Sequence, residues 1–321
     1  MKRKRLPPEI FKIPVQLIKQ GWYSDKYFIR TKEILQKDRN HNRVLMQVFA
    51  RQAGIICGVD LAIAILKLCA DKPQQLKIRA LYDGEPIKKN ETIMTIEGDY
   101  STFAHLETVY LGILARASAV ATAVRRVVEV ARGKTVLFFS ARFDYFANQE
   151  LDGYAAYIGG AQGVSTDAGA SWWQAQGIGT IPHSLIAAYQ GDTVQAALAF
   201  DRYMPPEIQR IVLVDFDNDC IGTSLKVAQA LGDRLWGVRF DTAENLQDKS
   251  VKGRGKNFRG VCPQLVFKAR QALDRAGGPL QLRDQRPARG RPGLLREPRR
   301  QGRGWSCLLY TSPSPRDLST S

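Results

Sequence analysis

Cysteine and histidine are scarce in this sequence, and neither forms a recognisable cluster. There are five cysteines and three histidines in 321 residues, with no Cys-x-x-Cys pair and no histidine at the spacing of a zinc site. A chain of this length can bury a sizeable core without disulfide cross-links. The spacing therefore predicts core thiols in a reducing compartment and no zinc site.

Long apolar runs and phosphate-binding glycine motifs are also absent. The most apolar helical stretch, residues 55–70, contains Asp60 and Lys67 and is too short to span a bilayer. The basic start, residues 1–5, leads into Leu-Pro-Pro rather than into a secretory signal. Neither Gly-x-x-x-x-Gly-Lys-Ser/Thr nor Gly-x-Gly-x-x-Gly occurs, which argues against a P-loop kinase and a dinucleotide-binding domain. We therefore predict a soluble cytoplasmic protein with no membrane partner.

Positive charge is what the chain has in excess. The formal net charge is +16, which by itself favours a nucleic acid or a membrane surface as partner. Much of this charge lies in residues 2–5 and 279–321, so the middle of the chain is only mildly basic. We predict no specific nucleic-acid partner, and we keep a basic RNA-binding α/β protein as the alternative from another functional class.

The hydrophobic pattern divides the chain into four segments. Residues 1–10 are expected to form a basic disordered tail, and residues 11–132 an N-terminal α/β domain that ends in a long linking helix. Residues 133–278 are predicted to form a second domain, followed by a disordered tail at 279–321. The elements predicted in the first domain are a strand at 44–49, an amphipathic helix at 54–69, a strand pair at 76–82 and 91–97, and a helix at 102–132.

Strands and helices alternate in the second domain. Strands are predicted at 135–140, 163–166, 178–181, 211–216 and 235–240, and helices at 150–158, 169–176, 184–203, 220–231 and 262–276. Five successive βα units predict a parallel sheet, either open or closed as a barrel. The alternation stops near Gly278, because residues 279–303 contain no Ile, Val, Phe or Lys. A native basic arm would explain this tail, but we favour a shifted reading frame followed by non-native sequence.

Each predicted strand of the second domain ends in polar residues. In a parallel sheet these ends converge on one face and would line one pocket. Asp215 and Asp241 suit Mg²⁺ or ribose hydroxyls, and Arg142 and Arg239 can form forks to phosphate or carboxylate oxygens. One polar strand end is more often a cap or a surface ion pair. Five in succession favour a site for a phosphorylated substrate bound with magnesium.

The third strand end carries a proline, a histidine and a serine in succession. Pro182 suits the start of a helix and Ser184 can cap it, so His183 would stand beside the pocket together with Thr180. Taken alone, this histidine is also well explained as a surface-loop residue. Arg116 lies among apolar residues of the long helix, where a buried guanidinium needs an anionic partner that could be a ligand.

The other two histidines are predicted to have no role in a site. His41 is expected in a polar loop, because it lies in the run Asp-Arg-Asn-His-Asn-Arg. His105 is expected at the start of the long helix, in a structural role.

Several strings of the sequence occur together in one known family. They are Phe-Phe-Ser-Ala-Arg (138–142), Gly-Thr-Ile-Pro-His-Ser (179–184), Leu-Val-Asp-Phe-Asp (213–217), Gly-Val-Arg-Phe-Asp (237–241), and Thr-Ile-Glu-Gly-Asp-Tyr-Ser (95–101) followed by Leu-Glu-Thr-Val-Tyr-Leu-Gly (106–112). From about Trp22 to Gly278 the chain resembles nicotinate phosphoribosyltransferase, in the nicotinate/quinolinate branch of the type II phosphoribosyltransferases. The resemblance implies an N-terminal α/β sandwich followed by an irregular, TIM-like α/β barrel, here truncated after five βα units.

The resemblance also implies an activity in NAD biosynthesis and salvage. Nicotinate and phosphoribosyl pyrophosphate would give nicotinate mononucleotide and pyrophosphate, with Mg²⁺ as cofactor and ATP as a co-substrate in many members. Family members are usually homodimers whose active sites lie at the subunit interface. The partners implied are therefore nicotinate, phosphoribosyl pyrophosphate and a second copy of the chain.

Roles for individual residues follow from the same resemblance. The implied catalytic residues are His183, Asp215 and Asp241, of which the two acids also hold the metal. The implied substrate-binding residues are Tyr23 or Tyr27, Arg116 and Arg142, to which the polar strand ends add Thr180, Ser184 and Arg239. His183 resembles the histidine that ATP phosphorylates, and Arg116 resembles an arginine lent to the neighbouring subunit's site. Tyr23 or Tyr27 resembles an aromatic residue that stacks on the pyridine ring.

Two features depart from the family pattern. The segment Asp-Thr-Ala-Glu-Asn-Leu, residues 241–246, differs from the family's Asp-Ser-Gly-Asp-Leu, which favours a divergent branch over the ATP-coupled subtype. The remaining barrel strands do not follow Gly278, so we expect this polypeptide to be inactive or unstable. Within the family the alternative is quinolinate phosphoribosyltransferase, whose substrate has a second carboxylate and whose reaction releases carbon dioxide. A non-catalytic, oligomer-forming paralogue is a further alternative.

Overall fold

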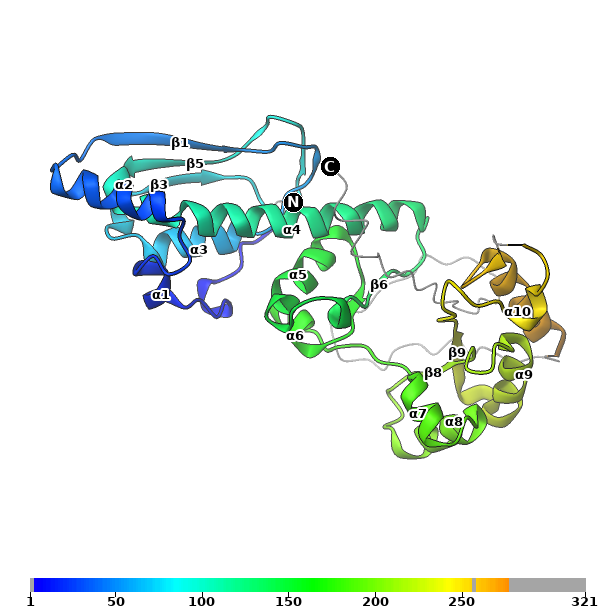
Figure 1. The fold of residues 1–321 in the computed structure, drawn as a ribbon. Coiled ribbons are helices and arrows are strands. Elements are labelled where there is room, and N and C mark those ends of the chain that lie inside the picture. The colour runs from blue at the N-terminus through cyan, green and yellow to red at the C-terminus, as the bar shows by residue number, and fades with distance from the viewer. Residues whose placement is uncertain (1–2, 256–257, 277–321) are drawn as a thin grey trace. The chain divides into compact units, whose positions relative to one another are not determined.

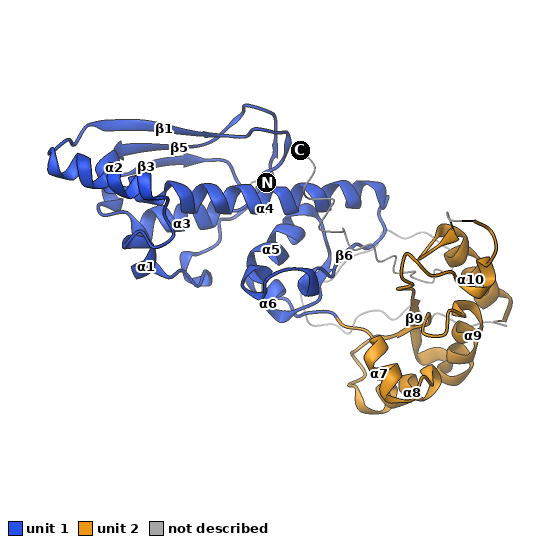
Figure 2. Ribbon diagram, viewed as in Figure 1, with its two compact units in different colours: residues 1–178, 312–321 blue, residues 179–311 orange. Residues whose placement is uncertain are grey.

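The computed structural model describes residues 3–255 and 258–276. Within them the chain forms two compact units, and the first ends at Ile178 (Figure 2). The boundary predicted at Gly278 and the tail predicted for 279–321 lie outside the described residues.

A three-stranded antiparallel sheet forms one side of the first unit. Its strands are β1 (Arg43–Phe49), β5 (Thr92–Asp99) and β3 (Lys77–Ala80), in the order β1-β5-β3. Val48 and Met46 of β1 face the core, whereas Leu45 and Phe49 are exposed. This alternation is that of a sheet with one covered face. The antiparallel register of β3 with β5 confirms the predicted pairing of residues 76–82 with 91–97.

Helices cover the inner face of this sheet (Figure 1). The helices of this region are α1 (Val15–Lys19), α2 (Lys26–Lys37), α3 (Val59–Cys69) and α4 (Glu107–Val130). The short strands β2 (Gly54–Ile55) and β4 (Pro86–Ile87) form a separate antiparallel pair. Side chains of α3 and of the first half of α4 join those of β1 and β5 in one hydrophobic core. The compact unit that contains this core extends to Ile178, and the domain boundary at residue 132 stays a prediction.

The rest of the first unit packs along α4. Helix α5 (Gln149–Gly159) lies close to α4, because a Cβ on Gly159 would be only 2.6 Å from the carbonyl oxygen of Ala121. The strands β6 (Leu137–Phe138) and β7 (Gly163–Val164) form a parallel pair. In the sequence α5 connects these two strands, and α6 (Asp167–Ala170) follows β7.

A second parallel pair forms the centre of the second unit. The strands β8 (Arg210–Leu213) and β9 (Leu235–Arg239) are connected by α9 (Cys220–Leu231), and their pairing shifts between Arg210 and Ile211. The other helices of this unit are α7 (His183–Ala188), α8 (Thr193–Tyr203) and α10 (Pro263–Ala276). Helix α9 has the predicted bounds.

Short 3-10 turns connect many of these elements. They are Pro8–Ile10, Pro73–Gln75, Tyr100–Thr102, Ala104–Leu106, Ala141–Phe143, Phe146–Asn148, Ser171–Trp173, Gly232–Arg234 and Lys249–Val251. Two of them precede α4, so the predicted long helix begins at Glu107 rather than at residue 102.

The barrel expected from five βα units is not closed within the described residues, where the parallel strands form two separate pairs. The predicted strand at 178–181 is wrong. Its two ends belong to different units and make one backbone hydrogen bond each, from Ile178 N–H to Val164 C=O and from Ile181 N–H to Ile211 C=O. One bond at each end is too few for a strand ladder.

Two predicted helices are shorter than expected. The helix expected from residue 54 begins at Val59, because Gly58 before it has a φ of 90° and residues 54–55 pair with β4 instead. The helix expected over 184–203 is divided by Gly191, whose φ is 87°. Asp192 then caps α8 by accepting a hydrogen bond from the Gln195 N–H at 2.9 Å.

The basic segment expected to be a disordered tail packs against the first unit. Arg5 forms an ion pair with the buried Asp60 at 2.7 Å and donates to the carbonyl oxygens of Ala80 and Leu81 at 3.0 Å. The Arg3 guanidinium lies over the ring of Tyr154. Composition predicted a solvated segment here, but these specific partners order it. Among residues 3–255 and 258–276, no helix is both long and apolar enough to cross a membrane.

Candidate functional site

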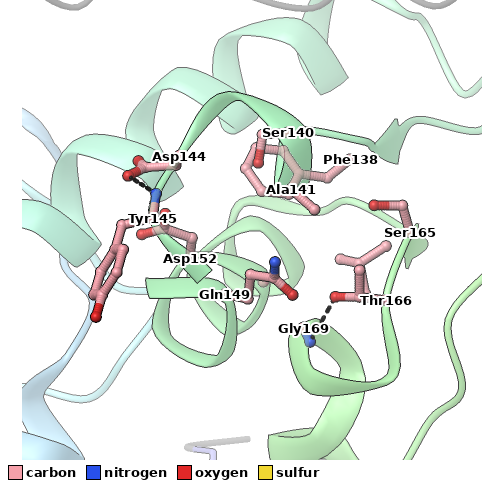
Figure 3. Close-up of a pocket in the computed structure, with 12 residues that line it drawn as sticks. Phe138, Ser140, Ala141, Asp144, Tyr145, Gln149, Asp152, Ser165, Thr166 and Gly169 are labelled. Atoms are coloured by element: carbon pink, nitrogen blue, oxygen red, sulfur yellow. Dashed lines mark hydrogen bonds between the residues drawn. The ribbon is translucent and has the colours of Figure 1, made fainter. Parts of the chain in front are cut away.

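A pocket opens in the first unit where β6 and β7 end (Figure 3). Its lining residues are Phe138, Ser140, Ala141, Asp144, Tyr145, Gln149, Asp152, Gly153, Val164, Ser165, Thr166 and Gly169. The two strands are parallel, so the residues after each of them reach the same edge, which is where strand-helix proteins place their sites. Ser140, Ser165 and Thr166 of the predicted polar strand ends therefore line one pocket, whereas Arg142 and Asp167 do not.

Two carboxylates of this pocket hold Arg116. The Arg116 Nε and Nη2 donate to the two carboxylate oxygens of Asp152, both at 2.8 Å. The same Nη2 donates to Asp144 Oδ2. The hydrogen bonds that Arg116 donates to Asp152 raise the pKa of Arg116. Burial acts against this shift, and the hydrogen bond to Asp144 and the charges of both acids add to it. The anionic partner predicted for Arg116 is thus supplied by the chain itself.

Asp144, Asp152 and Gln149 were missed by sequence reasoning. Gln149 and Asp152 lie in the first turn of α5, where a negative charge such as that of Asp152 is favoured by the helix dipole, and Asp144 lies before the 3-10 turn that precedes α5. That acidic start of the helix was the available signal. Arg142, which was predicted to bind substrate, is exposed, does not line the pocket, and forms no hydrogen bond or ion pair with a described residue.

Predicted site residues of the second unit gather at the ends of β8 and β9. Arg239 donates from Nη1 to Thr180 Oγ1 and from Nη2 to Asp241 Oδ2, the latter at 2.6 Å. Leu213 and Arg239 are paired across the two strands, so Asp215 and Asp241 follow at equal distances along the chain. The structure therefore brings Thr180, Asp215, Arg239 and Asp241 to the end of the β8–β9 pair. The ends of β6 and β7 belong to a separate sheet in the other unit, so one pocket shared by all five polar strand ends is not confirmed.

His183 joins this cluster through Asp215. Its Nε2 lies 3.3 Å from Asp215 Oδ1, and its side chain is about half exposed while that of Asp215 is buried. Burial raises the pKa of the Asp215 carboxyl, which His183 and a backbone hydrogen bond counteract and the charge of Asp241 reinforces. Ser184 is the second residue of α7, and Pro182 precedes the helix without a side-chain cap. The cap predicted at Ser184 is wrong.

A divalent cation has two candidate ligands in the second unit. Asp215 Oδ1 is buried without a hydrogen-bond partner among the described residues, which suits an oxygen that accepts from a cation. Nowhere in residues 3–255 and 258–276 do three His, Cys, Asp or Glu side chains form a metal-binding group. Mg²⁺ is commonly held by one or two carboxylates together with substrate phosphates and water, so Asp215 and Asp241 fit that ion, and the magnesium site stays a prediction.

The two predicted tyrosines and two of the histidines lie elsewhere in the first unit. Tyr23 and Tyr27 are exposed and do not line the pocket, and the Tyr27 hydroxyl donates to Asp25 at 3.1 Å. His41 is exposed in a loop and contacts Asp99. His105 is fully buried, in agreement with its predicted structural role.

Parts of the chain match known proteins in sequence. Residues 25–118 match the family described as quinolinate phosphoribosyl transferase, N-terminal domain. The nicotinate phosphoribosyltransferase of Bacillus subtilis is 28% identical over 204 residues, which are 62% of this chain and 37% of that protein. A probable carboxylating nicotinate-nucleotide pyrophosphorylase of Methanothermobacter thermautotrophicus is 29% identical over 90 residues, which are 28% of this chain and 31% of that protein. The chain thus spans less than two-fifths of these curated relatives.

Several crystal structures match over most of the chain. The nicotinate-nucleotide pyrophosphorylase of Pyrococcus furiosus is 33% identical, with a TM-score of 0.71, and the match covers 86% of this chain and 67% of that one. Identity at this level over two thirds of a relative reflects common descent as well as a common fold. The chain belongs to the nicotinate/quinolinate phosphoribosyltransferase family.

Proposed function

We propose that the protein transfers a phosphoribosyl group from phosphoribosyl pyrophosphate to a pyridine carboxylate in NAD biosynthesis, with quinolinate as the acceptor. The products would be nicotinate mononucleotide, pyrophosphate and carbon dioxide. The observation that carries this proposal is the 33% identity to a nicotinate-nucleotide pyrophosphorylase over 86% of the chain. The N-terminal family match points the same way. Quinolinate, the alternative in the sequence analysis, therefore has better support than nicotinate.

The cluster at the ends of β8 and β9 suits this chemistry. Displacement of pyrophosphate from C1 of ribose passes through a cationic sugar, so the protein mainly has to position the reactants and stabilise separating charges. Asp215 and Asp241 would face the ribose as carboxylates. Arg239, which Thr180 and Asp241 hold in place, would offer its remaining donors to phosphate oxygens. Mg²⁺ held by the two acids would neutralise charge on the leaving pyrophosphate.

Nicotinate is the second candidate acceptor. The match to the Bacillus subtilis nicotinate phosphoribosyltransferase spans 62% of the chain. The first unit also favours a single carboxylate, because Arg116, the cation paired with Asp144 and Asp152 of the pocket lining, is already shared by these two acids. A second carboxylate on the ring would have to be balanced by other cations.

An assay with both acids separates these candidates. The protein would be incubated with phosphoribosyl pyrophosphate and Mg²⁺, and with either quinolinate or nicotinate, while nicotinate mononucleotide is measured. Carbon dioxide released in equal amount to the mononucleotide would identify quinolinate as the acceptor. Mononucleotide formed only from nicotinate would identify nicotinate, not quinolinate, as the acceptor. Formation from neither acid would contradict the proposed function, whereas turnover of either acid would refute the inactivity expected from the sequence.

ATP coupling is proposed for His183 as a separate property. Its imidazole is about half exposed and lies against Asp215, which would orient the ring for phosphorylation. Addition of ATP should then raise the turnover of the wild type, and His183→Ala should keep the basal transfer without responding to ATP. A response to ATP that persists in the variant would assign the coupling to another residue.

A homodimer is proposed on the exposure of Tyr23 and Tyr27. Both rings lie outside the pocket of their own unit, as expected of side chains that serve a second copy of the chain. Light scattering of the purified protein measures the oligomeric state directly. A monomer would overturn the proposal.

A further inference from the structure

The two acids that hold Arg116 use different edges of its guanidinium group. Asp152 takes the edge formed by Nε and Nη2, with two hydrogen bonds of 2.8 Å. Asp144 reaches only Nη2 of the edge formed by Nη1 and Nη2. The Nη1 atom forms no hydrogen bond with a described residue, and the Arg116 side chain is 38% exposed. One edge is therefore fully used, and the other is half occupied and open to solvent.

The two acids also differ in how firmly they are held. The Asp152 side chain is 8% exposed and lies in the first turn of α5, whereas that of Asp144 is 41% exposed. A buried two-bond pair is costly to break, but an exposed ion pair contributes little stability and exchanges readily. Asp152 is thus the fixed partner of Arg116, and Asp144 is the replaceable one.

Asp144 can release Arg116 without losing its own position. Its Oδ1 accepts from the Tyr145 N–H at 2.7 Å and from the Asn148 side-chain amide at 2.9 Å, and only its Oδ2 contacts Arg116. The turn before α5 is therefore held by one oxygen and Arg116 by the other. Figure 3 shows Asp144 and Asp152 on the same side of the pocket.

We propose that Asp144 occupies the place of a substrate carboxylate on Arg116 and is displaced from it when the pyridine carboxylate binds, while Asp152 positions the guanidinium. This inference rests on the proposed function, because it makes Asp144 a competitor of the substrate carboxylate for Arg116. An incoming carboxylate would bind to both Nη1 and Nη2, in place of one contact from Asp144. A substrate carboxylate can then bind Arg116 only by breaking the ion pair with Asp144. The free energy needed to break this pair lowers the affinity for every substrate that binds through Arg116.

The decisive variant is Asp144→Asn. The asparagine carbonyl oxygen can still accept from Tyr145 and hold the turn, but the charge that competes for Arg116 is gone. Glu129→Gln is the matched control, because Glu129 is an exposed acid of α4 that has the same charge and lies outside the pocket. Binding of quinolinate and of nicotinate to each variant would be measured by isothermal titration calorimetry, and KM and kcat by the assay above.

Asp144→Asn should bind the preferred acid roughly two- to five-fold more tightly than the wild type, the factor that corresponds to an exposed ion pair. KM should fall by the same factor with kcat unchanged, because Asp144 is displaced in both the bound state and the transition state. Glu129→Gln should match the wild type. Asp152→Asn should weaken binding roughly ten-fold or more, since the guanidinium loses its fixed partner.

The outcomes separate the inference from the proposed function. If the wild type binds a pyridine carboxylate and Asp144→Asn binds it no more tightly than Glu129→Gln does, the inference is wrong and the function stands. If the wild type neither binds nor converts either acid, the proposed function fails, and the inference fails with it. Because Asp144 is exposed, its variant should fold, so the result does not depend on the buried Asp152.

Discussion

The Nε2 of His183 lies 3.3 Å from Oδ1 of Asp215, yet that oxygen accepts no hydrogen bond from a described residue. The two groups are close enough for an ion pair but are not aligned for a hydrogen bond. A buried carboxylate with one unsatisfied oxygen costs stability. Such a loss of stability is typical of functional sites, whose residues are suited to bind a ligand and do not maximise the stability of the fold.

Asp215→Asn should therefore stabilise the protein and inactivate it. Burial, together with the charge of Asp241, raises the pKa of Asp215, so the folded state binds this proton more readily than the unfolded state does. The cost of burying the charge is absent at low pH and grows as the pH rises through the folded-state pKa. The amide should raise the free energy of unfolding at neutral pH by about 1 kcal/mol, measured by urea denaturation, and lower turnover at least roughly 100-fold. A variant less stable than the wild type at neutral pH would contradict this.

His105 should make the free energy of unfolding depend on pH in the mildly acidic range. Burial, with Lys32 as the next cause, lowers the pKa of His105 to about 4 from 6.5, and neither ring nitrogen has a hydrogen-bond partner among the described residues. Because the unfolded state binds the proton more readily, stability should fall as the pH drops from about 6.5 to about 4, by up to about 3 kcal/mol. His105→Leu should remove that slope in urea denaturation at a series of pH values. Parallel profiles for the two proteins would refute the prediction.

Gly153 should tolerate no side chain. A Cβ at this position would lie 2.6 Å from the Cα of Gly169 and would overlap its carbonyl oxygen, and both glycines line the pocket. Gly153→Ala should cost roughly 2–4 kcal/mol, because the clash is with backbone. Gly112→Ala is the control, since nothing lies within 4 Å of its Cβ position, and it should leave stability unchanged or raise it by up to about 1 kcal/mol. Equal unfolding midpoints would show that the pocket wall can shift.

Removal of Arg5 should destabilise the first unit more than removal of Lys4 does. Arg5→Ala leaves the buried Asp60 with only the Leu6 N–H, which donates to it at 2.8 Å, and should cost about 2–3 kcal/mol. Lys4 is exposed, so Lys4→Ala should change the free energy of unfolding by less than about 0.5 kcal/mol. Thermal unfolding of both variants measures the difference. If both variants lowered the stability equally, this segment would behave as the solvated tail that its composition predicts.

Local patterns predicted the elements that local interactions determine. The strand at β1, the pair β3 and β5, and helix α9 follow from alternation and from helical periodicity in their own residues. The sequence could not predict that residues 178–181 cross from one unit to the other, because that depends on partners remote in the chain. Gly58 and Gly191 interrupt predicted helices through a positive φ, which composition allows but does not require.

Candidate site residues divide in the same way. The strand ends at Asp215, Arg239 and Asp241 were predictable because strand direction alone brings them to one edge. The partners of Arg116 were not predictable, because the sequence shows a charge among apolar residues without showing which acid pairs with it. Asp144 and Asp152 lie 28 and 36 residues away from Arg116 along the chain, and only packing of α5 on α4 joins them.

The shift in pairing between β8 and β9 determines which way the two acids of the second unit point. Arg210 pairs with Leu235 and Ile211 with Gly237, so Trp236 is an extra residue in β9. Without it, Asp215 would be level with Phe240, and Asp241 would turn toward the opposite face of the sheet, because side chains alternate with a period of two. The extra residue thus keeps both carboxylates in phase. An insertion or deletion of one residue in either strand would therefore turn Asp215 and Asp241 toward opposite faces of the sheet, although both acids would still be present in the chain.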